Sequence, residues 1–150
     1  EESPVEVEAD APQQHPDACG SWRRVTLRYA DGCEIVLDGE NADPEAAFIE
    51  GPSGRLLRGF RSNVPGWKDA LAATPDPEPQ DSDFGRAVRE RRKFPLNEAN
   101  GHRSCTLVNL AKIAVRLGRP LRFDGASERF IGDDEANRLI DEPMRAPWTL

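Results

Sequence analysis

The side chains best suited to chemistry lie near residue 102, where an amphipathic helical pattern begins. His102 and Arg103 follow Gly101, and an imidazole beside a guanidinium at a helix N-terminus can donate hydrogen bonds to an anion or a hydroxyl-rich ligand. The alternative is structural, with His102 capping the helix and tying its start to the preceding loop. We take His102 and Arg103 as candidate substrate-binding residues and leave that alternative open.

The other chemically suggestive residues favour structural roles. Ser104 and Cys105 lack an elbow motif and a base–carboxylate partner in the sequence, so we expect Ser104 to cap the helix and Cys105 to be buried. The run Asp133-Asp134-Glu135 resembles a cation site, but acids that open a helix already stabilise its dipole. We therefore expect no catalytic, cofactor-binding or metal-ligating residue in this chain.

Composition excludes several classes of partner. The 150 residues carry a formal net charge of −7, and an acidic protein repels phosphate backbones, so we expect no nucleic-acid partner. No apolar run approaches the roughly 18 residues of a membrane span, so we expect no membrane partner. Three scattered cysteines suit a reducing compartment, and we expect the cytoplasm. The chain starts at Glu1 and reads as a processed or excised piece, so an exported protein that has lost its signal is the alternative.

Alternating side chains predict an antiparallel hairpin between residues 22 and 38. A three-residue loop, Ala30-Asp31-Gly32, with Gly32 left-handed, places Tyr29 opposite Cys33. This register gives one core face and one charged face, and a slip of one residue would destroy both. The apolar pairs are Leu27 with Ile35 and Val25 with Leu37, and the charged pairs are Arg28 with Glu34 and Arg24 with Asp38.

The main helix is predicted over residues 103–117, where apolar residues repeat at intervals of three and four until Gly118 and Pro120 stop it. A shorter helix should run from Ser82 or Asp83 to Arg92 with Phe84, Ala87 and Val88 buried, and a last one from Asp133 or Asp134 to Ile140. Short strands are expected at residues 5–7 (an edge strand), 47–50, 55–58, 121–123 and 129–131.

These elements predict an α+β fold, a mostly antiparallel β-sheet with helices packed on one face. We expect one domain over residues 1–150. It comprises a β-rich part (1–73), a stiff proline-rich linker (74–82) and a helix-rich part (83–150).

Several blocks resemble one family in order and spacing. Asn97–Ser104, Arg116–Arg119 and the Arg145–Trp148 tail, and less specifically Phe48–Leu56, are similar to the C-terminal domain of the bacterial branch of the glucose-fructose oxidoreductase and inositol dehydrogenase family (Gfo/Idh/MocA). The resemblance implies that Trp148 pins the tail to the domain. It also implies an open sheet face that forms a substrate site and an oligomer interface, which the charged face of the hairpin suits.

Complete members of that family are NAD(P)-dependent oxidoreductases acting on sugars, cyclitols and their derivatives. Here no Gly-x-Gly-x-x-Gly occurs, and the family's catalytic lysine in a Glu-Lys-Pro motif has no counterpart. We therefore expect a partial C-terminal domain without a Rossmann domain and without a cofactor of its own, although NAD or NADP is implied for a complete member. Whether this chain is itself an enzyme stays open.

The resemblance gives two functional hypotheses. The first is the substrate-site and oligomerisation portion of a sugar or cyclitol oxidoreductase, not catalytic alone. Its partners would be further copies of itself through the sheet, the missing nucleotide-binding domain and a sugar-like small molecule. The second is a free-standing, non-catalytic binding or assembly module of the same fold.

Overall fold

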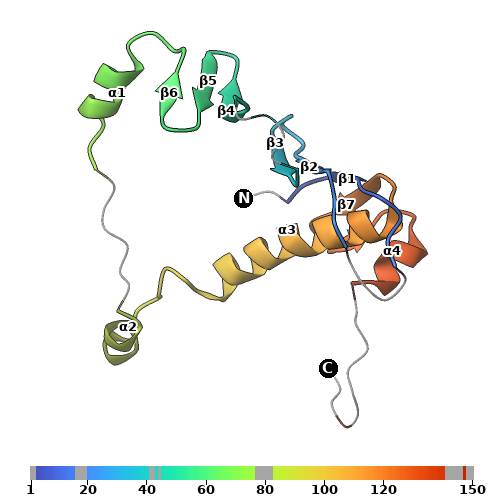
Figure 1. The fold of residues 1–150 in the computed structure, drawn as a ribbon. Helices are drawn as coiled ribbons and strands as arrows, with labels where there is room; N and C mark the ends of the chain where they lie inside the picture. The colour runs from blue at the N-terminus through green and yellow to red at the C-terminus, as the bar shows by residue number, and fades with distance from the viewer. Residues whose placement is uncertain are drawn as a thin grey trace. The chain divides into compact units, whose positions relative to one another are not determined.

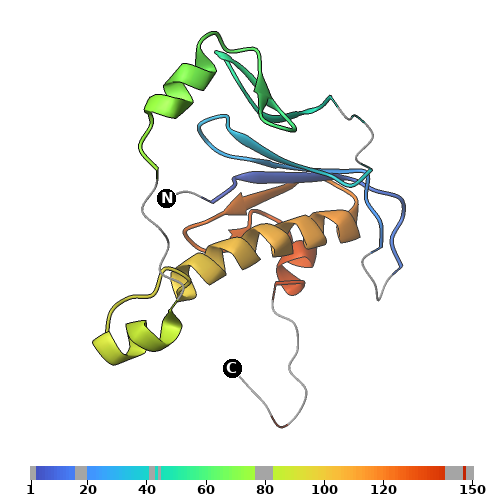
Figure 2. The same ribbon diagram turned by 60° about the vertical axis from the view of Figure 1, so that its left-hand side comes forward.

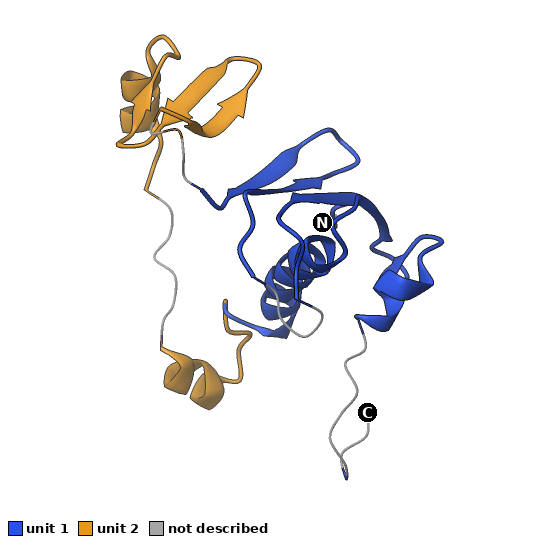
Figure 3. Ribbon diagram, turned by 45° about the vertical axis from the view of Figure 1, so that its right-hand side comes forward, with its two compact units in different colours: residues 1–40, 96–150 blue, residues 41–95 orange. Residues whose placement is uncertain are grey.

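The computed structural model describes residues 3–15, 20–40, 43, 45–76, 83–140 and 147, and Figure 1 shows the path of the chain. The chain divides into a first unit, residues 1–40 with 96–150, and a second unit, residues 41–95, coloured separately in Figure 3. The first unit therefore takes elements from both the β-rich and the helix-rich parts. The prediction of one domain over residues 1–150 stays a prediction.

The described part of the first unit contains β1 (Glu6–Asp10), β2 (Arg24–Arg28), β3 (Glu34–Asp38), α3 (Glu98–Leu117), β7 (Leu121–Asp124), β8 (Arg129–Phe130) and α4 (Asp134–Arg138). Its strands form an antiparallel sheet in the order β3-β2-β1-β7-β8. Helix α3 packs on β1 and β2 along one face, as Figure 2 shows. This architecture confirms the predicted α+β fold with a mostly antiparallel sheet.

β1 lies in the middle of the sheet, so the expected edge strand was wrong. Val7 is paired with Leu27 on one side and with Leu121 on the other, and its side chain is fully buried. The pairing with Leu121 joins segments more than 100 residues apart. No local pattern could have indicated it, because an edge strand and a short central strand look alike in sequence.

The predicted register of the β2–β3 hairpin is confirmed in every pair. Leu27 lies opposite Ile35 and Arg28 opposite Glu34, and the amide of Tyr29 donates to the carbonyl oxygen of Cys33 at 2.9 Å. Gly32 takes the left-handed conformation, with φ of 87°, that the three-residue loop requires.

The predicted core face is only half buried. Val25 and Leu27 on β2 are 1% exposed, whereas Ile35 and Leu37 on β3 are 39% and 38% exposed. A helix about 10 Å wide covers two strands spaced about 4.8 Å apart, and α3 lies over β1 and β2. Helix α3 therefore does not cover the edge strand β3.

Helix α3 begins earlier than predicted and ends where predicted. Asn97 caps it, its side chain accepting from the amides of Ala99 and Asn100, and Gly118 ends it with φ of 63°. The expected cap, Ser104, lies in the second turn, where its hydroxyl donates to the carbonyl oxygen of Asn100, and Cys105 is exposed rather than buried. The earlier start follows from Asn97, a strong cap that lies six residues before the predicted first residue, Arg103.

The core of the first unit consists of apolar side chains from the inner sheet face, α3 and α4. Its buried members are Val7, Val25, Leu27, Leu110, Ala111, Ile113, Ala114, Val115, Leu121, Phe123, Phe130 and Ala136. Asp133 caps α4, as predicted, by accepting from the amide of Ala136. Trp148, Pro143 and Cys19 lie outside the described residues.

The second unit is described by itself. Its elements are β4 (Ala47–Gly51), β5 (Gly54–Leu57), β6 (Arg61–Ser62), α1 (Trp67–Ala73) and α2 (Phe84–Glu90). The β4–β5 hairpin was expected, whereas β6 and α1 were not. Asp83 caps α2 as predicted, but Phe84 and Val88 are 63% and 58% exposed, and only Ala87 of the three expected residues is buried. Residues 77–82 of the expected linker lie outside the described residues.

Candidate functional site

His102 lies in the second turn of α3, close to the turn that joins β7 to β8. Its Nε2 is 2.7 Å from Oε1 of Glu128, and both side chains are more than half exposed. Glu128 takes a left-handed backbone conformation, with φ of 54°. The contact joins α3 to the β7–β8 turn, and it leaves the other ring nitrogen of His102 able to bond a ligand.

A pocket of about 420 Å³ opens beside this pair. The side chains that line it come from α3, β7, the β7–β8 turn and the segment after α4: His102, Cys105, Thr106, Asn109, Leu110, Lys112, Ile113, Phe123, Glu128, Leu139 and Ile140. Its volume suits a small molecule, and its lining combines apolar and polar groups.

Arg103 is absent from that lining. Its guanidinium donates to the carbonyl oxygen of Ala99 at 3.3 Å and to Oδ1 of Asn100 at 2.8 Å, both on its own helix. Adjacent residues on a helix point about 100° apart, so His102 and Arg103 do not share a surface. The substrate-binding role of the two residues stays a prediction.

The prediction that His102 lies at the N-terminus of its helix, where free amides could bind an anion, is wrong. The helix begins at Glu98, so the free amides lie one turn earlier, and the side chain of Asn97 accepts from two of them at 3.0 and 3.3 Å. Glu98 adds a negative charge in the first turn. The remaining candidate is the pair of His102 and Glu128 beside the pocket. Its imidazole and carboxylate can orient a hydroxyl group or relay a proton.

The opposite face of the sheet carries a charged cluster centred on Arg28. Its guanidinium donates to Glu6 at 2.5 Å, to Glu8 at 3.1 Å and to Glu34 at 2.8 Å. These bonds raise the pKa of Arg28 above its ordinary value. Sequence reasoning identified the pair with Glu34 but missed Glu6 and Glu8, although their alternation on one strand was a visible signal.

The Arg28 cluster and the His102 pocket lie on opposite sides of the sheet. Val7 and Leu27 point toward α3, and side chains alternate along a strand, so Glu6, Glu8 and Arg28 point to the other face. His102 lies on α3 itself. One small ligand therefore cannot touch both sites.

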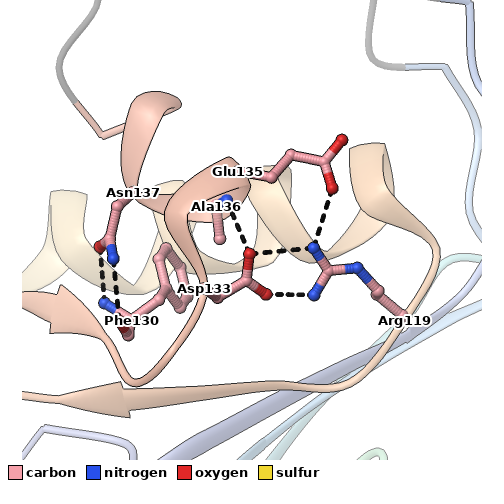
Figure 4. Close-up of polar contacts among 6 residues, drawn as sticks. All are labelled: Arg119, Phe130, Asp133, Glu135, Ala136 and Asn137. Carbon is pink, nitrogen blue, oxygen red and sulfur yellow. Dashed lines mark hydrogen bonds and ion pairs between the residues drawn. The ribbon is translucent and has the colours of Figure 1, made fainter.

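The acids at the start of α4 bind an arginine. Two nitrogens of Arg119, from the α3–β7 turn, donate to the carboxylate of Asp133, and one of them also donates to Oε2 of Glu135 at 3.0 Å (Figure 4). The guanidinium and the amide of Ala136 hold the pKa of Asp133 at about 2. In the described ranges, no group of three or more His, Cys, Asp and Glu side chains is arranged to hold a metal ion.

Asn137 fastens α4 to β8 next to these contacts. Its Oδ1 accepts from the amide of Phe130 at 2.8 Å and its Nδ2 donates to the carbonyl oxygen of the same residue at 2.9 Å (Figure 4). The side-chain amide thus pairs with β8 as a neighbouring strand would. Together with the Arg119 contacts, it holds α4 against β8 and the α3–β7 turn.

The described residues do not form a Rossmann-type site for a dinucleotide. Binding of NAD in a Rossmann fold needs parallel strands and a glycine-rich turn that opens a helix. Every strand pairing in the described ranges is antiparallel, and Gly51 and Gly54 lie opposite each other in a hairpin. We therefore assign no step of hydride transfer to the described residues.

These features define an α+β domain whose antiparallel sheet has one helix-covered face and one charged face. The chain belongs to the Gfo/Idh/MocA oxidoreductase family: over residues 1–150 it matches the family model described as the C-terminal alpha/beta domain of the oxidoreductase family. The resemblance seen in the sequence is thereby confirmed. No curated protein and no solved structure matches the chain. Among the helices described, none is long and apolar enough to cross a membrane.

Proposed function

We propose that residues 1–150 supply the substrate-site wall and the oligomer interface of an NAD(P)-dependent oxidoreductase that acts on a sugar or cyclitol. Family membership supports the reaction class. The observation that carries the proposal is the charged sheet face, where one arginine and three carboxylates converge and no helix among the described residues of the first unit covers them.

Such a surface suits a polyol or a second subunit. Carboxylates and a guanidinium at 37–47% exposure can exchange hydrogen bonds with hydroxyl groups or with matching charges on another copy. His102 would contact a separate small molecule, in the pocket on the other side of the sheet. In this proposal a separate domain binds the nucleotide and carries the proton-transfer group, so the chain does not catalyse hydride transfer alone. The proposed compartment is the cytoplasm.

Sedimentation velocity tests the assembly role. The wild-type chain should self-associate at tens of micromolar, and Arg28→Ala should weaken the association because three carboxylates would then face the partner without their guanidinium. Arg116→Ala removes the same charge from the exposed surface of α3 and should have no effect. A wild-type monomer, or an equal effect of both variants, would contradict an interface on this face.

The mass of the natural product separates the proposal from the free-standing module. In cells of the source, a product more than twice the 16.6 kDa of this chain supports a portion of a larger oxidoreductase. A product of about this mass supports the binding or assembly module instead.

A further inference from the structure

The outer edge of β3 is a surface that the proposed function does not use. β3 ends the five-stranded sheet, and no strand in the described ranges pairs with its outer side. Ile35, Val36 and Leu37 are each 38–39% exposed, so three consecutive apolar side chains meet solvent there. An edge of this kind is able to accept another strand.

The alternation of hydrogen-bonded and non-bonded pairs between β2 and β3 shows which N–H and C=O groups of β3 point away from β2. Cys33 accepts from Tyr29, and the amide of Gly39 donates to the carbonyl oxygen of Arg23, each at 2.9 Å. Because bonded and non-bonded pairs alternate along an antiparallel ladder, the odd-numbered residues of β3 bond to β2. Glu34 and Val36 therefore direct their N–H and C=O groups to the outer side.

β3 carries only part of what usually protects an edge. Native edge strands carry charged side chains, especially lysine, or a proline or a bulge that prevents further pairing. β3 reads Glu-Ile-Val-Leu-Asp and keeps an unbroken register with β2 over five residues, so it has no proline, no bulge and no lysine. The backbone of the strand is therefore able to pair again, and the acids Glu34 and Asp38 restrict which strand can do so.

Charge decides what kind of strand fits. From Tyr29 to Gly54 the sequence contains seven acids and no lysine, arginine or histidine. Arg28 is already shared among three carboxylates, so the surroundings of Glu34 stay negative. A second copy pairing antiparallel about Val36 would place Glu34 opposite Asp38 twice, which is unfavourable.

The chain itself contains the complementary pattern. β2 reads Arg-Val-Thr-Leu-Arg, and its arginines lie opposite Asp38 and Glu34 while its apolar residues lie opposite Leu37 and Ile35. We propose that the outer edge of β3 binds an extended basic segment of a partner protein as an added antiparallel strand. The segment would have basic residues at its first and fifth positions and apolar residues at its second and fourth.

A peptide with the sequence of residues 22–30 tests this proposal on the full chain. Fluorescence anisotropy of the labelled peptide should show saturable binding that weakens as salt rises from about 0.05 to about 0.5 M. A matched peptide with glutamate in place of the arginines at positions 24 and 28 should bind about tenfold more weakly or worse. Absence of saturable binding, or equal binding of both peptides, would overturn the proposal.

Two variants locate the binding edge. Val36→Pro removes an outward N–H without removing a β2–β3 bond, so it should reduce peptide affinity about tenfold or more while the circular dichroism spectrum is unchanged. The double variant Glu34→Gln with Asp38→Asn preserves the backbone and should abolish most of the salt dependence. Wild-type binding by both variants, or a chain dimer that Val36→Pro dissociates, would refute a basic partner at this edge.

Discussion

Val7→Ala tests the central position of β1 and the packing of α3 on the sheet. Val7 is fully buried between Leu27 and Leu121. Val5 provides a matched control, because it has the same side chain two residues away and is 41% exposed. Both substitutions remove the same two methyl groups, and Val5 directly precedes β1, so the contrast compares a buried with a half-exposed valine in one short segment.

The structure gives the size of the effect. Val→Ala removes two methyl groups, worth about 1.6 kcal/mol of transfer free energy at full burial. β1 is hydrogen-bonded on both sides and cannot collapse into the space, so the cavity raises the cost of Val7→Ala to about 2–3 kcal/mol. At 41% exposure, Val5→Ala should cost about 1 kcal/mol or less.

Urea unfolding followed by circular dichroism at the helix band measures both values, since α3 supplies twenty helical residues of the first unit. With an m-value of about 1–2 kcal/mol/M, Val7→Ala should lower the urea midpoint by about 1–3 M, and Val5→Ala by about 1 M or less. If the two variants differ by less than about 0.5 kcal/mol, β1 is not the buried central strand and the reasoning fails.

Three further predictions concern the segment from the end of α3 to α4. Folding holds the pKa of Asp133 at about 2, below its ordinary value of 3.8, so its stabilisation is present above about pH 4 and is lost as the pH falls towards 2. Asp133→Asn, which keeps a capping oxygen but loses the charge that binds Arg119, should flatten that part of the pH dependence of the urea midpoint. Gly118→Ala should cost about 1 kcal/mol by thermal unfolding, because φ is 63° and no atom crowds the added Cβ. Asn137→Ala should cost about 1–3 kcal/mol and speed amide exchange at Phe130, since both backbone groups of that residue lose their partner; unchanged exchange would disprove the strand-like contact.

Local patterns predicted the parts of the fold that local forces determine. The β2–β3 register followed from alternation and from Gly32, and the end of α3 followed from Gly118 and Pro120. The start of α3 was misplaced because Ser104 was taken as its cap, although Asn97 is the capping residue.

Long-range contacts were beyond local patterns. The position of β1 depends on pairing with β7, and the partner of His102, Glu128, lies 26 residues away across a turn. The exposure of Ile35 depends on which strands α3 covers, which periodicity does not encode. The charged face of the hairpin was predicted from the sequence, whereas the pocket beside His102 and the exposed edge of β3 became visible only in the tertiary structure.

The central claim is that this chain shapes a substrate site and an assembly while another domain binds the nucleotide. Isothermal titration calorimetry with NADH, NADPH and their oxidised forms tests it most directly. The claim predicts no saturable heat for any of the four nucleotides with the folded chain. A one-to-one isotherm with a micromolar Kd for any of them would contradict it.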